Sequence, residues 1–168
     1  SYIKENDIVI DATIGNGNDT LYLSKVVENG KVFGFDIQED AIKNTKDLLD
    51  KNNCHNYELF LSSHNKMSSI LSDYLGKVSL VLFNLGYLPN GDKTITTNYE
   101  TTIEAIEESF KLIHKMGMIL VVIYPGHESG KIESEKIHEY LDKNNINYIE
   151  YHNTDNVIAP YLIEIKKK

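Results

Sequence analysis

The sequence predicts an α/β fold with a mostly parallel sheet of seven strands, the last two of which form an antiparallel pair. Short apolar runs alternate with amphipathic stretches along the chain, as in β-α-β units around a parallel sheet. A turn with two glycines follows the apolar run Ile8-Val9-Ile10, as at a ligand-binding edge. Only residues 153–156 separate the last two strands, and so short a connection requires an antiparallel pair.

The individual elements follow from apolar spacing. The first strand contains the apolar run Ile8-Val9-Ile10, which is typical of a buried parallel strand. The helix of residues 99–115 carries Ile103, Ile106 and Phe110 on one face. Gly117 begins the fifth strand, and Pro160 suits the start or edge of the last one. The predicted strands are Ile8–Ala12, Lys31–Asp36, Tyr57–Ser62, Val78–Asn84, Met118–Tyr124, Tyr148–His152 and Val157–Ile165. The predicted helices are Asn18–Glu28, Glu39–Lys51, Asn65–Tyr74, Tyr99–Lys115 and Lys131–Lys143.

Length and composition limit the classes of protein. A chain of 168 residues suits one domain, residues 1–168, and since it starts at Ser1 without methionine we expect an N-terminal truncation. Cys54 is the single cysteine, which excludes a disulfide framework and a cysteine zinc site and favours the cytoplasm. We expect no membrane segment and no metal, and a homodimer is compatible with the sequence. The net charge of −8 argues against tight, sequence-blind binding of long duplexes, although a local basic patch is not excluded.

The glycine turn is the first candidate site. It reads Asp11-x-Thr13-x-Gly15-Asn16-Gly17-x-Asp19-Thr20. The glycines allow a tight bend against which a ligand can lie, and the following helix offers free N–H groups. Thr20 stands where a dinucleotide fingerprint has its third glycine, and Asp11 suits a cationic ligand better than a pyrophosphate. The structural alternative is an ordinary strand-to-helix turn.

The second strand also ends in an acid. Asp36 is placed to bind two ribose hydroxyls, so it indicates an adenosine nucleoside; the alternative is an acid that precedes the next helix. Ile37 and Gln38 would then flank the nucleoside, with Ile37 against the adenine. His64, after the third strand, either contacts the adenine or is an ordinary loop histidine.

The fourth strand is apolar until Asn84, after which the chain turns through Gly86-Tyr87 and Pro89. A polar residue in such a run should have a hydrogen-bond partner. Asn84 is therefore a candidate site residue, and the alternative is a turn after a core strand.

These segments resemble a known fold and family. The glycine turn resembles the first motif of class I S-adenosylmethionine-dependent methyltransferases, which have a Rossmann-like fold with seven strands in this arrangement. The run from Asn84 resembles the Asn-Pro-Pro-Tyr motif of methyltransferases that act on amino groups, with Leu85-Gly86 in place of Pro-Pro. Together with Phe35-Asp36-Ile37-Gln38 and Tyr124-Pro125-Gly126-His127, they resemble the bacterial family long labelled putative rRNA methylase. Members have been assigned to the wobble uridine of tRNA.

The resemblance implies S-adenosylmethionine as cofactor and the anticodon region of tRNA as partner. The implied reaction is N-methylation of the aminomethyl group of wobble 5-aminomethyl-(2-thio)uridine. The implied cofactor-binding residues are Asp11, Thr13, Gly15, Asn16, Gly17, Asp19, Thr20, Asp36, Ile37, Gln38, His64 and Asn84. The catalytic candidates are Asn84, to orient the amine, and Asp92 or His127, to accept its proton. The substrate-binding candidates are Tyr87, Leu88, Pro89, Lys93 and Thr97.

Three other functions stay open on the sequence. One is methylation of an amino group in rRNA or another nucleic acid. A second is an NAD-dependent reductase, which would share Asp36 and the glycine turn but is disfavoured by Thr20 and by the absence of a Tyr-x-x-x-Lys pair. A third is a non-catalytic Rossmann-like nucleotide-binding module, which would have no need of the loop that follows Asn84.

Overall fold

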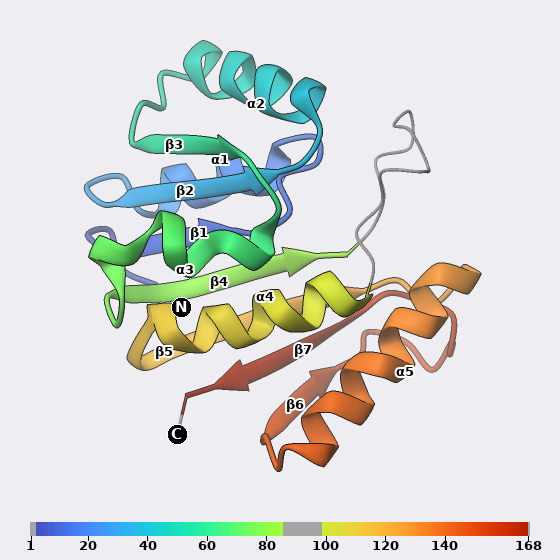
Figure 1. The fold of residues 1–168 in the computed structure, drawn as a ribbon. Coiled ribbons are helices and arrows are strands. Elements are labelled where there is room, and N and C mark those ends of the chain that lie inside the picture. Colours follow the sequence, from blue (N-terminus) through green and yellow to red (C-terminus); the bar gives the residue numbers. More distant parts are fainter. Residues whose placement is uncertain (1–2, 86–98, 168) are drawn as a thin grey trace.

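A seven-stranded sheet with the order β3-β2-β1-β4-β5-β7-β6 forms the centre of the computed structural model, which describes residues 3–85 and 99–167 (Figure 1). Strands β1 to β5 run parallel, whereas β7 is antiparallel to both β5 and β6. This confirms the predicted fold class. The strands are β1 (Ile8–Asp11), β2 (Lys31–Asp36), β3 (Tyr57–Leu61), β4 (Val78–Asn84), β5 (Ile113–Ile123), β6 (Tyr148–Tyr151) and β7 (Tyr161–Lys166).

Helices cover both faces of the sheet. The larger ones are α1 (Asn18–Val26), α2 (Glu39–Lys51), α4 (Tyr99–Leu112) and α5 (Glu128–Lys143). Helices α3 (Met67–Ile70) and α4 lie in front of the sheet in Figure 1, and α1 lies behind it. No helix among the described residues has the length and apolar composition needed to cross a membrane.

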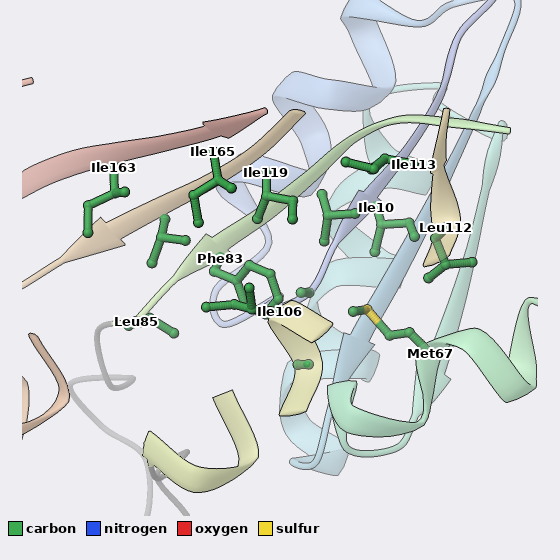
Figure 2. Packing of buried hydrophobic residues seen from close by; sticks show 14 of the residues in the cluster. Ile10, Met67, Phe83, Leu85, Ile106, Leu112, Ile113, Ile119, Ile163 and Ile165 are labelled. Carbon is green, nitrogen blue, oxygen red and sulfur yellow. The ribbon is translucent and has the colours of Figure 1, made fainter. Parts of the chain in front are cut away.

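Two apolar clusters hold the sheet between these layers. The larger one joins the centre of the sheet to α3, α4 and α5, with Phe83 and Ile106 among its fully buried members (Figure 2). The smaller one packs Leu23 and Val27, from α1 and its end, against Val9 and Val32 of the sheet. Because side chains of β1, β2 and β4 are packed in this way, the ends of these strands are held in fixed relative positions.

Several predicted elements have different bounds in the structure. The helix predicted at 65–74 is broken into a 3-10 turn at His64–Lys66, the short helix α3 and a second 3-10 turn at Ser72–Tyr74. Strand β5 begins at Ile113, not at Met118, because α4 ends early and the pairing with β4 shifts register between Val78 and Leu80. Gly117 lies inside this strand, where an added Cβ would stand 2.9 Å from the Val78 carbonyl oxygen.

The last strand was predicted to begin too early, at Val157. The structure starts it at Tyr161 and leaves Val157 exposed in the preceding turn. Asn156 organises that turn, since its side-chain and backbone oxygens accept hydrogen bonds from the N–H groups of Ile158 and Ala159. These N–H groups are therefore used locally and are not available for pairing with β5.

Candidate functional site

Polar residues stand at the carboxyl ends of three adjacent parallel strands. Asp11 ends β1, Asp36 ends β2 and Asn84 ends β4. Asp11 is paired in register with Gly34 on one side and with Leu82 on the other. This edge of an open α/β sheet is where such folds bind ligands, so the structure brings three predicted site residues to the expected place.

The turn after β1 requires both of its glycines. Gly15 has φ of 58° and Gly17 has φ of 87°, a left-handed region that glycine adopts most readily. An added Cβ at Gly17 would stand 2.5 Å from Oγ1 of Thr45 in α2, so this glycine also permits close packing. At Gly15 the nearest atom to an added Cβ would be the Thr13 carbonyl oxygen at 3.9 Å. The turn therefore has space above Gly15 in which a ligand can approach its backbone.

Asp11 lies beneath this turn and is fully buried. One carboxylate oxygen accepts the Thr13 N–H at 3.1 Å, and the other accepts the Thr20 hydroxyl at 2.7 Å. Burial raises the pKa of Asp11 to about 7, helped by the charges of Asp19 and Asp36 and opposed by the two hydrogen bonds. Asp11 thus joins the two ends of the turn, and its contact with a cationic ligand remains a prediction.

Asp36 crosses from the second strand to the same turn. Its carboxylate accepts the Gly15 N–H at 3.0 Å and the Gln38 N–H at 2.8 Å, one on each oxygen. Burial raises the pKa of Asp36, while these N–H groups oppose the rise. A carboxylate offers about four acceptor sites, so the side chain keeps accepting capacity for the ribose hydroxyls. The neighbouring Ile37 is 40% exposed, as an apolar contact for a base requires.

Asn84 makes two hydrogen bonds to the glycine-turn segment. Its backbone N–H donates to the Thr13 hydroxyl at 2.6 Å, and its side-chain Nδ2 donates to Asp19 Oδ2 at 3.0 Å. Asp19 belongs to the first turn of α1. The two links were not predicted, because the residues are 71 and 65 positions apart in the chain. The only sequence signal was the rule that a polar residue ending an apolar strand should have a partner.

Asn16 has a local role in the structure. Its side-chain oxygen accepts the Asn18 N–H at 3.1 Å, at the start of α1. This hydrogen bond supports the turn, and a contact of Asn16 with the cofactor remains a prediction.

The structure places His64 in the core beneath the glycine turn, and its contact with the adenine remains a prediction. The ring is 2% exposed, and its Nδ1 lies 3.0 Å from the Ala12 carbonyl oxygen. Its edge packs on Phe83 with a centroid distance of 5.4 Å. Burial lowers the pKa of His64 to about 4, so the ring is neutral and donates its Nδ1 proton to Ala12. The residue supports the glycine turn from below.

A buried neutral histidine makes stability depend on pH. The pKa of His64 is about 4 in the folded state and near 6.5 in the unfolded state. The free energy of unfolding that the neutral buried ring contributes is therefore complete above pH 6.5 and is lost as the pH falls towards 4. We expect the stability difference between wild type and His64→Gln to shrink by roughly 2 kcal/mol between pH 7 and pH 5. Urea unfolding at both pH values measures this. Comparing two proteins cancels the opposite contribution of Asp11, and equal slopes would contradict the burial of a neutral ring.

His127 stands at the start of α5, after the carboxyl end of β5. Its Nδ1 accepts the Gly130 N–H at 3.3 Å and lies 3.2 Å from the Ser129 hydroxyl. This cap explains why α5 begins at Glu128 and not at the predicted Lys131. The role of His127 as a proton acceptor remains a prediction.

Six other predicted site residues, Tyr87, Leu88, Pro89, Asp92, Lys93 and Thr97, lie outside the residues that the structure describes. Within residues 3–85 and 99–167, no three or more His, Cys, Asp or Glu side chains are grouped so as to hold a metal ion.

Comparison with solved structures agrees with this architecture. A putative rRNA methylase from Clostridium thermocellum superposes with a TM-score of 0.87 at 42% identity, covering 99% of this chain and 91% of that one. A putative methyltransferase from Streptococcus mutans, in complex with SAH, superposes with a TM-score of 0.84 at 29% identity, covering 99% and 92%. The strand order and the position of the polar edge are those of the class I methyltransferase fold.

Comparison at the sequence level identifies the family within this class. The model described as putative rRNA methylase matches residues 32–166, and the chain belongs to that family. A chloroplastic tRNA (mnm5s2U34)-methyltransferase from Arabidopsis thaliana is 40% identical over 150 residues, or 82% of this chain. The match spans 54% of that protein, so the chain covers about half the length of this relative.

Proposed function

We propose that this chain transfers the methyl group of S-adenosylmethionine to the primary amine of 5-aminomethyl-(2-thio)uridine at the wobble position of tRNA. The observation that carries the proposal is Asn84, a carboxamide held at the carboxyl end of β4, beside the glycine turn. Support for the substrate comes from the family and from the name of the Arabidopsis relative, which specifies a methyltransferase for a modified uridine 34 of tRNA.

The residues at the edge of the sheet suit this cofactor. The space above Gly15 accepts a ligand against the backbone, and Asp36 keeps accepting capacity for the ribose hydroxyls. Ile37 offers an apolar contact to the adenine. Asp11 and Asp36 lie close enough for their charges to interact, and this local negative charge suits a cationic methionine moiety.

The chain contributes alignment and control of one proton. S-adenosylmethionine supplies a methyl group on a positively charged sulfur, so the amine lone pair forms the N–C bond while the C–S electron pair stays on sulfur. Asn84 orients the amine, and such positioning can supply several kcal/mol. The amine must also be neutral before it attacks, so its proton passes to His127, to Asp92 or to solvent. Tyr87 stacks on the uracil base in this proposal.

The direct test is methyl transfer to defined tRNA. The substrate is tRNA from cells that lack the final wobble methylation, so that it carries the aminomethyl group, and the product nucleosides are identified by mass spectrometry. We expect a gain of one methyl on the aminomethyl nitrogen, with none on tRNA whose wobble amine is already methylated. Transfer to another position, or an unchanged nucleoside with a protein that binds S-adenosylmethionine, would contradict the substrate assignment.

Methylation of rRNA is the second candidate. It is favoured by the description of the family model and by a Mycoplasma mobile ribosomal RNA small subunit methyltransferase H, which is 29% identical over 107 residues. The same assay with ribosomal subunits and isolated rRNA separates the two substrates. Transfer to rRNA with none to tRNA would replace the tRNA proposal.

A further inference from the structure

We infer that Asp19 is a positioning residue that fixes the orientation of the Asn84 carboxamide, so that its oxygen faces the acceptor amine. The inference rests on the proposed function, because it assigns to Asp19 a task in aligning that amine. Asp19 lies in the first turn of α1, and its Oδ2 accepts a hydrogen bond from Asn84 Nδ2 at 3.0 Å.

The chemistry of the two groups determines which way the carboxamide points. An ionised carboxylate can only accept hydrogen bonds, so the end of Asn84 that faces Asp19 must be its NH2 group. The reverse orientation would place the Asn84 oxygen against a carboxylate oxygen, which is repulsive. The hydrogen bond from the Asn84 backbone N–H to Thr13 fixes the backbone at the same point. The side-chain oxygen is therefore held on the side away from Asp19.

This orientation matters for an amine acceptor. A neutral amine has N–H groups to donate and one lone pair with which to attack. An oxygen facing the amine accepts an N–H and leaves the lone pair free for the methyl group. An NH2 group facing the amine would instead donate to that lone pair and occupy it. No described residue donates a hydrogen bond to Asn84 Oδ1, so this oxygen retains its accepting capacity for a substrate.

The test is Asp19→Asn. An asparagine at this position can present either its oxygen or its NH2 group to Asn84, so both orientations of the Asn84 carboxamide become hydrogen-bonded. We expect kcat for the aminomethyl substrate to fall about twofold, the effect of placing only about half of the population in the competent orientation. The affinity for S-adenosylhomocysteine, measured by calorimetry, should change less than about threefold, which is under 1 kcal/mol.

Asp40→Asn is the matched control. Asp40 is the second residue of α2, as Asp19 is the second residue of α1, so both substitutions remove the same charge from the same position of a helix. Loss of the favourable interaction with the helix dipole is therefore common to both variants. We expect Asp40→Asn to retain kcat, and an equal fall in kcat for both variants would overturn the inference.

A double-mutant cycle with Asn84→Ala completes the test. If Asp19 acts through Asn84, adding Asp19→Asn to Asn84→Ala should lower kcat no further. Fully additive losses, or a tenfold or greater loss of cofactor affinity in Asp19→Asn at unchanged kcat, would overturn the inference and make Asp19 a cofactor ligand. The proposed function is tested by a separate result. If the Asn84→Ala protein transfers methyl groups at the normal rate, Asn84 does not align the amine, and the inference loses its basis.

Discussion

Asn84→Ala is expected to lower the rate of methyl transfer by about a hundredfold, the scale for removing a positioned hydrogen-bonding group from an active site. The affinity for the cofactor should stay nearly unchanged, because the lost group acts on the amine. A group that acts mainly in the transition state lowers kcat and kcat/KM together. Single-turnover transfer to tRNA that lacks the final methyl group measures the rate, with the folded fraction checked by circular dichroism.

A suitable control for this variant is Asn52→Ala. Asn52 follows α2, and its side-chain amide donates to the Leu48 carbonyl oxygen at 2.8 Å, so its loss removes a helix cap. This control should cost about 1 kcal/mol of stability and leave the transfer rate per folded molecule intact. If Asn84→Ala behaves in the same way, Asn84 is a structural residue and the alignment of an amine by its carboxamide is wrong.

Asp36→Ala is expected to weaken the binding of S-adenosylhomocysteine by about a hundredfold. The estimate takes two charge-assisted hydrogen bonds to the ribose at roughly 1.5 kcal/mol each. Asp36 also holds the Gly15 N–H, so the variant loosens the turn that lies against the ligand. Isothermal titration calorimetry measures the affinity.

The loss in Asp36→Ala should also appear for adenosine, which has the same ribose but no methionine moiety. Asp47→Ala removes an exposed carboxylate from α2 and serves as the charge control, with unchanged affinity. Wild-type affinity of the Asp36→Ala protein would place the nucleoside elsewhere.

Much of the fold follows from local features of the sequence. Apolar runs of strand length alternate with amphipathic runs of helix length. The length of each run and the spacing of its apolar residues determine whether most elements are strands or helices. The two-residue spacing of Gly15 and Gly17 marks the turn, and both adopt the left-handed conformations that favour glycine. The polar residues Asp11, Asp36 and Asn84 could be placed at one edge because parallel strands bring their carboxyl ends together.

The tertiary structure decided what each of these side chains contacts. From the sequence, His64 was either an adenine contact or an ordinary loop histidine, and packing against Phe83 and a hydrogen bond to Ala12 place it in the core. The bounds of β5 and β7 likewise depended on pairing with distant strands, and a propensity pattern does not contain this information. The sequence by itself thus determined the order of elements and the composition of the glycine turn. The link between Asp19 and Asn84 required the fold, because only the pairing of β1 with β4 brings residues 65 positions apart within hydrogen-bond distance.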